Sequence, residues 1–169
     1  MDGLTFGENG DVSAATSAAE MRELRYNWLW VLQRPNNSDR YTVRMRVVVF
    51  DRRVHLYAPP GSEAVVTTAA GFSPGNTAIT NVPTTAEVRK GTWVMDAGNQ
   101  GGGLRHAEFY RVVSVTEVPS GTNTTYTLEV HKPIVRADGQ AGAYTGTLVV
   151  MPAVAEVFDR PMLTGGNGP

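Results

Sequence analysis

RYNWLWVLQRPNNSDRYTVRMRVVVF, residues 25–50, consists of two apolar runs separated by a cluster of turn-forming residues. In the second run apolar side chains alternate with Arg and Thr, which is the pattern of a β-strand with one buried face. The first run is apolar on both faces around Trp28 and Trp30, which predicts a strand covered on both sides. Because Pro, Asn, Ser and Asp between residues 34 and 39 favour a turn, the whole stretch is expected to form a hairpin.

The same two-residue alternation recurs along the chain between clusters of Gly, Pro, Asn and Asp. Further strands are expected at 54–57, 63–69, 77–82, 92–97, 105–118, 125–132 and 144–151. Only 17–24 and 152–159 have helical character, each for about two turns. Eight or nine strands at this spacing predict an all-β fold, an antiparallel sandwich or small barrel with one or two short helices. A meander is expected from residue 92 to residue 151.

The length of 169 residues fits one domain with a substantial core. We expect a flexible N-terminal segment at 1–16, a single β-rich domain at 17–163 and a flexible tail at 164–169. The alternation places in the core Trp30, Val43, Met45, Val47, Val94, Val113, Val115, Tyr126, Leu128, Val130 and Leu148.

Four glycines fall within six positions of DAGNQGGGLRHAEFY, residues 96–110, and raise the question of a phosphate-binding loop. Such a loop needs a Lys-Ser/Thr pair and a following helix, and a dinucleotide site needs a βαβ unit. Here Leu104, Arg105 and a β-patterned run follow the glycines. The glycines are therefore expected to turn the chain, and no cofactor is expected.

Other signs of chemistry are few. The absence of cysteine excludes disulfides, zinc–thiolate sites, iron–sulfur clusters and cysteine nucleophiles. His106 and Glu108 share a strand face, which is either the start of a metal site or a solvent-facing pair. No serine lies in a nucleophile motif. The sequence therefore predicts a protein that is not an enzyme, with no catalytic, cofactor-binding or metal-ligating residue.

Charge is distributed unevenly. Residues 22–53 hold eight arginines against three acidic residues, a net charge of +5, which leaves −6 for the remainder of a chain whose total is −1. Arg40, Arg44 and Arg46 share one strand face near Trp28, and these four residues form the candidate interaction face. A basic surface beside tryptophan could bind nucleic acid. Alternatively the arginines pair with acidic neighbours or dock onto the acidic half, which the balanced total charge favours.

Five stretches together resemble the C-terminal globular part of large bacterial prepilin-like proteins, which are related to type II secretion pseudopilins and type IV pilins. They are EMRELRYNWLWVLQRP, VVVFDRRVHLYAPPGSEAVV, VRKGTWVMDAG, RHAEFYRVVSVTE and GTLVVMPAVAEVFDRP, within residues 17–163. The family's processed leader and long apolar N-terminal helix have no counterpart here, so the chain is expected to be a detached C-terminal region or a truncated relative. The resemblance implies a non-enzymatic role in the cell envelope or outside the cell and assigns no functional residue.

Two classes of function follow. The first is a structural or interaction domain, a β-rich head that contacts other protein subunits or its own copies; a phage or virion component would have the same composition. Trp28, Trp30 and Trp93 could anchor such an interface or could pack in the core. The second is a module that binds nucleic acid or carbohydrate through Arg40, Arg44 and Arg46. No signal peptide and no apolar run of membrane-spanning length is recognised, so no membrane-spanning segment is expected in this chain.

Overall fold

The computed structural model of the chain describes residues 4–6, 12–14, 26–33, 42–51, 63–98, 107–120, 123–136, 138–160 and 163–164. Its strands are β1 (Leu4–Phe6), β2 (Val12–Ala14), β3 (Tyr26–Gln33), β4 (Thr42–Asp51), β5 (Ala64–Phe72), β6 (Ala78–Pro83), β7 (Trp93–Asp96), β8 (Glu108–Ser120), β9 (Asn123–Val130), β10 (Tyr144–Met151), β11 (Val154–Asp159) and β12 (Leu163–Thr164). Within the described residues the only helical element is a 3-10 turn, η1 (Thr84–Ala86). The prediction of an all-β fold is confirmed.

Six of the strands form a closed antiparallel barrel in the order β10–β5–β6–β9–β8–β7. Strands β7, β8 and β9 follow one another as the predicted meander. The meander prediction is wrong beyond β9, because β10 crosses back and pairs with both β5 and β7. Closure explains this path, since β10 in that position satisfies the backbone groups of two strands that would otherwise be sheet edges.

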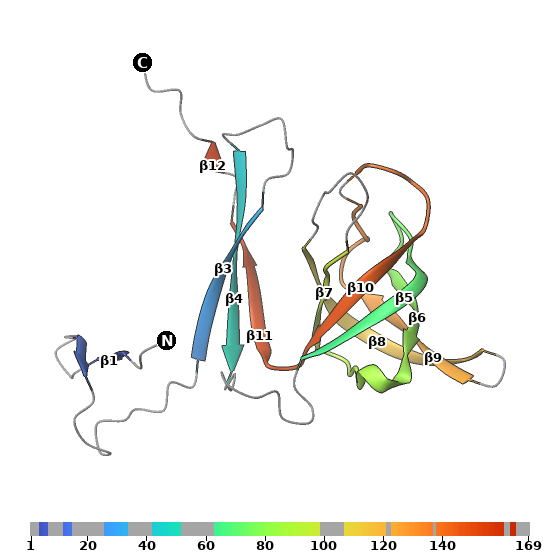
Figure 1. Cartoon of the computed structure of the whole chain (residues 1–169), viewed down its shortest axis with the longest axis horizontal. Helices are drawn as coiled ribbons and strands as arrows, with labels where there is room; N and C mark the ends of the chain where they lie inside the picture. The colour runs from blue at the N-terminus through green and yellow to red at the C-terminus, as the bar shows by residue number, and fades with distance from the viewer. Residues whose placement is uncertain are drawn as a thin grey trace.

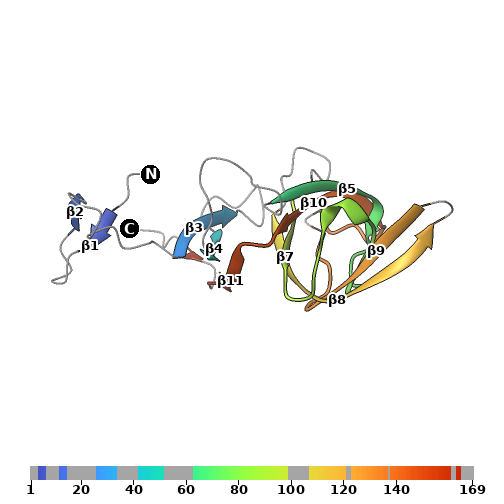
Figure 2. The same ribbon diagram turned by 90° about the horizontal axis from the view of Figure 1, so that it is seen from below.

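The remaining long strands form a small antiparallel sheet with β4 at its centre. β3 pairs along one edge of β4 and β11 along the other, and β12 pairs with the start of β4. The register between β3 and β4 runs without a break from Tyr26 opposite Asp51 to Gln33 opposite Arg44, which confirms the predicted hairpin. Figures 1 and 2 show this sheet standing beside the barrel, and β1 and β2 pair only with each other among the described strands.

Two apolar clusters hold the fold together. The first fills the barrel and consists of Phe72, Ile79, Val82, Ala86, Val88, Val94, Tyr110, Val112, Leu128, Val130, Ile134, Tyr144, Leu148 and Val150. The second lies between the sheet and the barrel and consists of Val48, Phe50, Trp93, Phe109, Met151 and Val154. Because the second cluster takes residues from both parts, the sheet packs on the barrel as a separate layer.

The helix expected at 152–159 is wrong, because these residues form β11 after a short turn. Val157 lies opposite Val48 and Phe158 opposite Val47, so β11 completes the edge of β4 that β3 leaves open. A two-turn helix has little stability by itself, whereas a strand here gains a full ladder of hydrogen bonds. The helix expected at 17–24 and the strand expected at 54–57 lie outside the described residues.

The predicted core is correct for the barrel except at Val113 and is wrong in the sheet. Of the predicted core residues, the barrel buries Val94, Leu128, Val130 and Leu148, and Val115 and Tyr126 pack against them in partly buried positions. Val43, Met45 and Val47 on β4 are only partly buried. Trp30 is 60 % exposed and Val113 is 44 % exposed, so both assignments to the core were wrong. The side chain of Val113 was assigned to the wrong face of its strand: the neighbouring Val112 points into the barrel, so Val113 points outward.

Candidate interaction surface

The two faces of β4 are the reverse of the sequence prediction. Alternate side chains of a strand point to opposite sides, and on β4 those of Arg46, Val48 and Phe50 face the barrel and are buried. The side chains of Val47 and Val49 point away from the barrel. The strand therefore turns its arginine-bearing face inward and its uniformly apolar face outward.

The register shows which residues of β3 and β11 share this outward face, because residues directly opposite each other in an antiparallel pair point to the same side. Trp30 and Phe158 both lie opposite Val47, and Trp28 lies opposite Val49. These five residues and Arg160 line an open hollow of about 390 Å³. We call this surface of β3, β4 and β11 the outer aromatic face.

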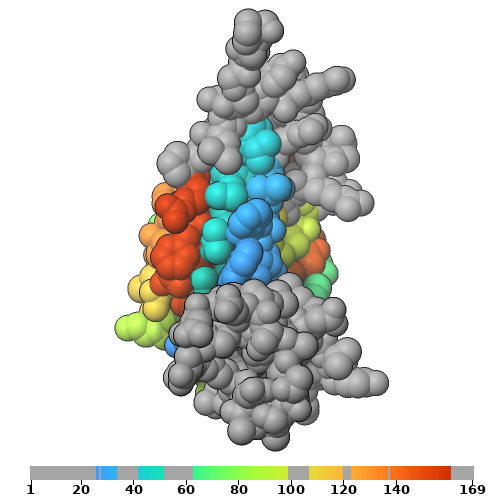
Figure 3. Space-filling view, turned by 90° about the vertical axis from the view of Figure 1, so that its left-hand side faces the viewer, coloured from blue at the N-terminus to red at the C-terminus, as the bar shows by residue number. Residues whose placement is uncertain are grey.

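The aromatic rings of this face are accessible to solvent. Trp28 is 58 % exposed, Trp30 60 % and Phe158 50 %. The two indole rings lie 5.5 Å apart between centroids, with their planes tilted by 30°. Figure 3 looks onto this side of the molecule and shows atoms of β3, β4 and β11 side by side on the surface. An apolar surface of this kind, outside the packed core, is the main candidate for an interaction site.

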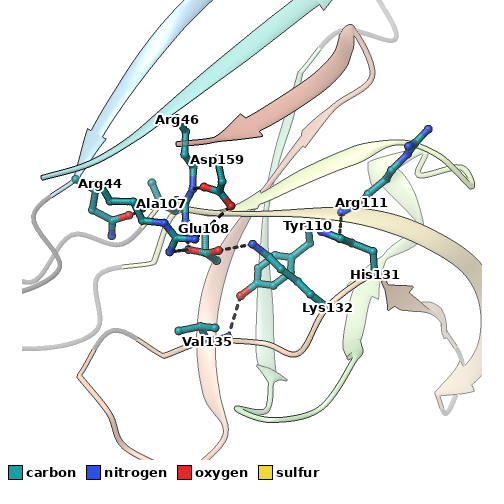
Figure 4. A network of polar contacts seen from close by, with 11 residues as sticks. Arg44, Arg46, Ala107, Glu108, Tyr110, Arg111, His131, Lys132, Val135 and Asp159 are labelled. Carbon is teal, nitrogen blue, oxygen red and sulfur yellow. Dashed lines mark hydrogen bonds and ion pairs between the residues drawn. The ribbon is translucent and has the colours of Figure 1, made fainter. Parts of the chain in front are cut away.

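The opposite face of the sheet carries a buried ionic contact at the junction with the barrel (Figure 4). Arg46 is only 1 % exposed, and its Nη2 donates to Oε2 of Glu108 at 2.5 Å. Its Nε donates to Oδ1 of Asp159 at 2.6 Å, and its Nη1 donates to the carbonyl oxygen of Ala107 at 2.6 Å. The guanidinium carbon also lies 5.7 Å from the ring centroid of Phe109. Arg46 therefore joins β4 and β11 of the sheet to β8 of the barrel.

Two more cations complete this cluster. Nζ of Lys132 donates to Oε1 of Glu108 at 2.5 Å. Arg44 reaches Oε2 of Glu108 at 3.4 Å and Oδ2 of Asp159 at 3.2 Å. We call Arg44, Arg46, Glu108, Lys132 and Asp159 the junction cluster. Its three cations contact two carboxylates, so the charge of the buried Glu108 is compensated where water is excluded, while Asp159 keeps 46 % of its side chain exposed.

The pKa values of both carboxylates follow from these contacts. Burial acts to raise the pKa of Glu108, but the Lys132 hydrogen bond and the charges of Lys132, Arg46 and Arg44 outweigh it and lower the pKa below its ordinary value. Burial likewise acts to raise the pKa of Asp159, and the hydrogen bond and charge of Arg46 lower it. Both groups are therefore ionised at neutral pH.

The structure places the three described residues of the predicted interaction face, Arg44, Arg46 and Trp28, on two different sides of the sheet. Arg40 lies outside the described residues. Arg44 and Arg46 share a face as predicted, but that face meets the barrel and its charges contact Glu108 and Asp159. Trp28 lies on the opposite side of the sheet. The pairing of arginines with the acidic half, one of the two interpretations of the charge pattern, is what the ion pairs show.

The other residues that the sequence suggested for a functional site form no site in the described part of the chain. His106 and the glycines at 101–103 lie outside the described residues. Glu108, the second member of the proposed metal pair, is 2 % exposed and accepts from cations on both of its oxygens. Trp93 is 5 % exposed and packs in the layer between sheet and barrel, so it belongs to the core rather than to an interface.

Comparison with known proteins identifies no relative of this chain. No protein-family model, no curated protein and no solved structure matches the chain. Within the described ranges, no three His, Asp or Glu side chains gather as a metal site would require. None of the helices described is long and apolar enough to cross a membrane. Fold and surface together define an all-β protein in which a six-stranded barrel supports a small sheet with an apolar outer face.

Proposed function

We propose that this chain is a non-enzymatic structural and interaction domain that binds other protein subunits through the outer aromatic face. The observation that carries the proposal is the more than half-exposed pair Trp28 and Trp30 beside Phe158, on a sheet whose other face is already packed. Contiguous apolar surface outside the core mostly marks a binding site. Tryptophan is also the residue most enriched among those that dominate binding energy.

The supporting layer suits this role. The junction cluster and the apolar layer of Val48, Phe50 and Trp93 join the sheet to the barrel through both ionic and apolar contacts. A surface held on a rigid support loses little conformational entropy on binding. Arg160 adds one charged residue to the otherwise apolar lining of the hollow, and arginine beside aromatic residues is a common composition of a protein–protein interface.

The resemblance to the globular part of prepilin-like proteins supports a more specific form of the proposal. In this form the chain is the β-rich head of a pseudopilin-like protein of the cell envelope or of a secretion system. A nucleic-acid surface built on Arg44 and Arg46 is less favoured, because both guanidinium groups contact carboxylates of the chain itself.

Site-specific photocrosslinking in the native cell tests the proposal. A benzophenone amino acid replaces Trp28 or Val49 on the outer aromatic face, and Val65 in the control, because Val65 is 68 % exposed on the barrel. We expect covalent adducts with defined protein subunits from the face positions and none from the control. Mass spectrometry of the adducts then shows whether the partners are envelope or secretion components. Adducts that are absent, or equally abundant at Val65, would contradict the proposal.

A further inference from the structure

The outer aromatic face has a composition that suits an identical face. Along β3 the eight residues Tyr26–Gln33 carry no charge, and Val47, Val49 and Phe158 extend the uncharged surface across β4 and β11. Arg160 is the charged residue among those that line the hollow. By the register, the acidic residues Asp51, opposite Tyr26, and Glu156, opposite Val49, lie on the same side of the sheet. Two copies can therefore bring the apolar side chains of Trp28, Trp30 and Phe158 together at the centre of a face-to-face contact.

The exposed area of the outer aromatic face is large enough for a small protein–protein interface. Trp28, Trp30 and Phe158, with Tyr26 and Leu32 on the same side of β3, are each exposed by half or more. At about 200 Å² for a whole aromatic side chain, this surface amounts to roughly 500 Å² per copy. Two copies would remove about 1,000 Å², which is near the lower limit for a specific interface and typical of a reversible one.

The geometry of sheet packing also fits. Sheets stack face to face about 10 Å apart with their inner side chains interdigitated. A two-fold axis through the outer aromatic face would bring the β3–β4–β11 sheets of two copies together and leave both barrels on the outside. The hollow of about 390 Å³ has room for a projecting ring of the other copy.

We infer that the outer aromatic face binds a second copy of this chain, forming a reversible, isologous dimer through sheet-on-sheet packing. The inference rests on the proposed function, since it names the partner of that same surface. Burial of Trp28 and Trp30 accompanies dimer formation, whereas Trp93 is buried in either state. Because an interface of this size is typical of reversible association, the dimer is expected to dissociate on dilution.

Light scattering and tryptophan fluorescence of the purified full chain test the inference from about 1 to 500 µM. We expect the mass to rise toward twice that of one chain while the emission moves to shorter wavelength. Trp30→Lys should remain a single chain over the whole range, and Val65→Lys on the barrel should dimerise as the unmodified chain does. If Trp30→Lys does not fold, as judged by circular dichroism, Phe158→Ser takes its place.

A chain that stays monomeric throughout, or a Trp30→Lys variant that dimerises normally, would overturn the inference. Equal loss of dimer in Val65→Lys would also overturn it, because the contact would then lie elsewhere. The two proposals fail separately. A monomeric chain that still crosslinks from Trp28 to another subunit keeps the proposed function, whereas a monomer that crosslinks to nothing loses both.

Discussion

Arg46 on β4 and Glu108 on β8 meet at 2.5 Å between Nη2 and Oε2, with side chains that are 1 % and 3 % exposed. This contact joins the small sheet to the barrel inside a region that solvent hardly reaches. Removing one partner of a buried ion pair leaves the other charge uncompensated, at a cost of about 3–5 kcal/mol. The stability of the junction should therefore depend on both residues together.

Glu108→Gln should lower the free energy of unfolding by about 3 kcal/mol, because Arg46 and Lys132 lose their shared countercharge. Chemical denaturation measures the change. The matched control is Glu156→Gln, since Glu156 lies 3.9 Å from Arg111 with both side chains well exposed, and this change should stay within about 0.5 kcal/mol. Equal effects of the two variants would show that the junction cluster is not a buried ion pair.

Stability should also fall in acid. The pKa of Glu108 is held below its ordinary value of 4.5 and that of Asp159 below 3.8, chiefly because the surrounding cations outweigh burial. The folded state thus binds these protons less readily than the unfolded state. The stabilisation is complete above the ordinary pKa values and is lost as pH falls through the lower folded values. Denaturation at a series of pH values should show a steeper acid decline for the unmodified chain than for Glu108→Gln, and parallel curves would refute this.

Two tryptophans should differ sharply in their contribution to stability. Trp93 is 5 % exposed in the layer between sheet and barrel, so Trp93→Ala should cost about 3–5 kcal/mol. Trp30 is 60 % exposed, and Trp30→Ala should cost less than about 1 kcal/mol. Denaturation at a concentration where the chain is monomeric separates the two. A large loss in Trp30→Ala would mean that this ring is covered within the chain.

Gly146 on β10 should not tolerate a methyl group. An added Cβ would lie 2.5 Å from Cε2 of the Phe72 ring inside the barrel, so Gly146→Ala should cost about 1–3 kcal/mol through overpacking. Gly142→Ala is the control, because its Cβ would meet nothing closer than an Arg136 nitrogen at 4.0 Å. The difference in melting temperature between these two variants measures the effect. Similar melting temperatures would indicate that Phe72 can move away.

The sequence indicated part of the junction cluster. The excess of arginine in residues 22–53 over acidic residues predicted that positive charge would be compensated elsewhere in the chain. It did not show which carboxylates would serve. Glu108 and Asp159 lie 62 and 113 positions from Arg46, so only folding brings these partners together. The outer aromatic face was predicted only in part: Trp28 and Trp30 were possible interface anchors or core residues, since exposed and buried tryptophans look the same in a sequence.

The amino-acid sequence by itself determined where strands β3 to β10 run and that they are antiparallel, because alternation and turn residues act over a few neighbouring positions. It determined the hairpin of β3 and β4 and the inward positions of Val94, Leu128, Val130 and Leu148 in the barrel. Tertiary structure alone decided which face of β4 is buried, since a period of two is equally consistent with either side facing inward. The countercharges of Glu108 and Asp159 allow Arg46 to be buried, and this places Val47, with Trp30 opposite it, on the outer surface. Tertiary structure also made residues 154–159 a strand, because the open edge of β4 offers them more hydrogen bonds than a short helix would.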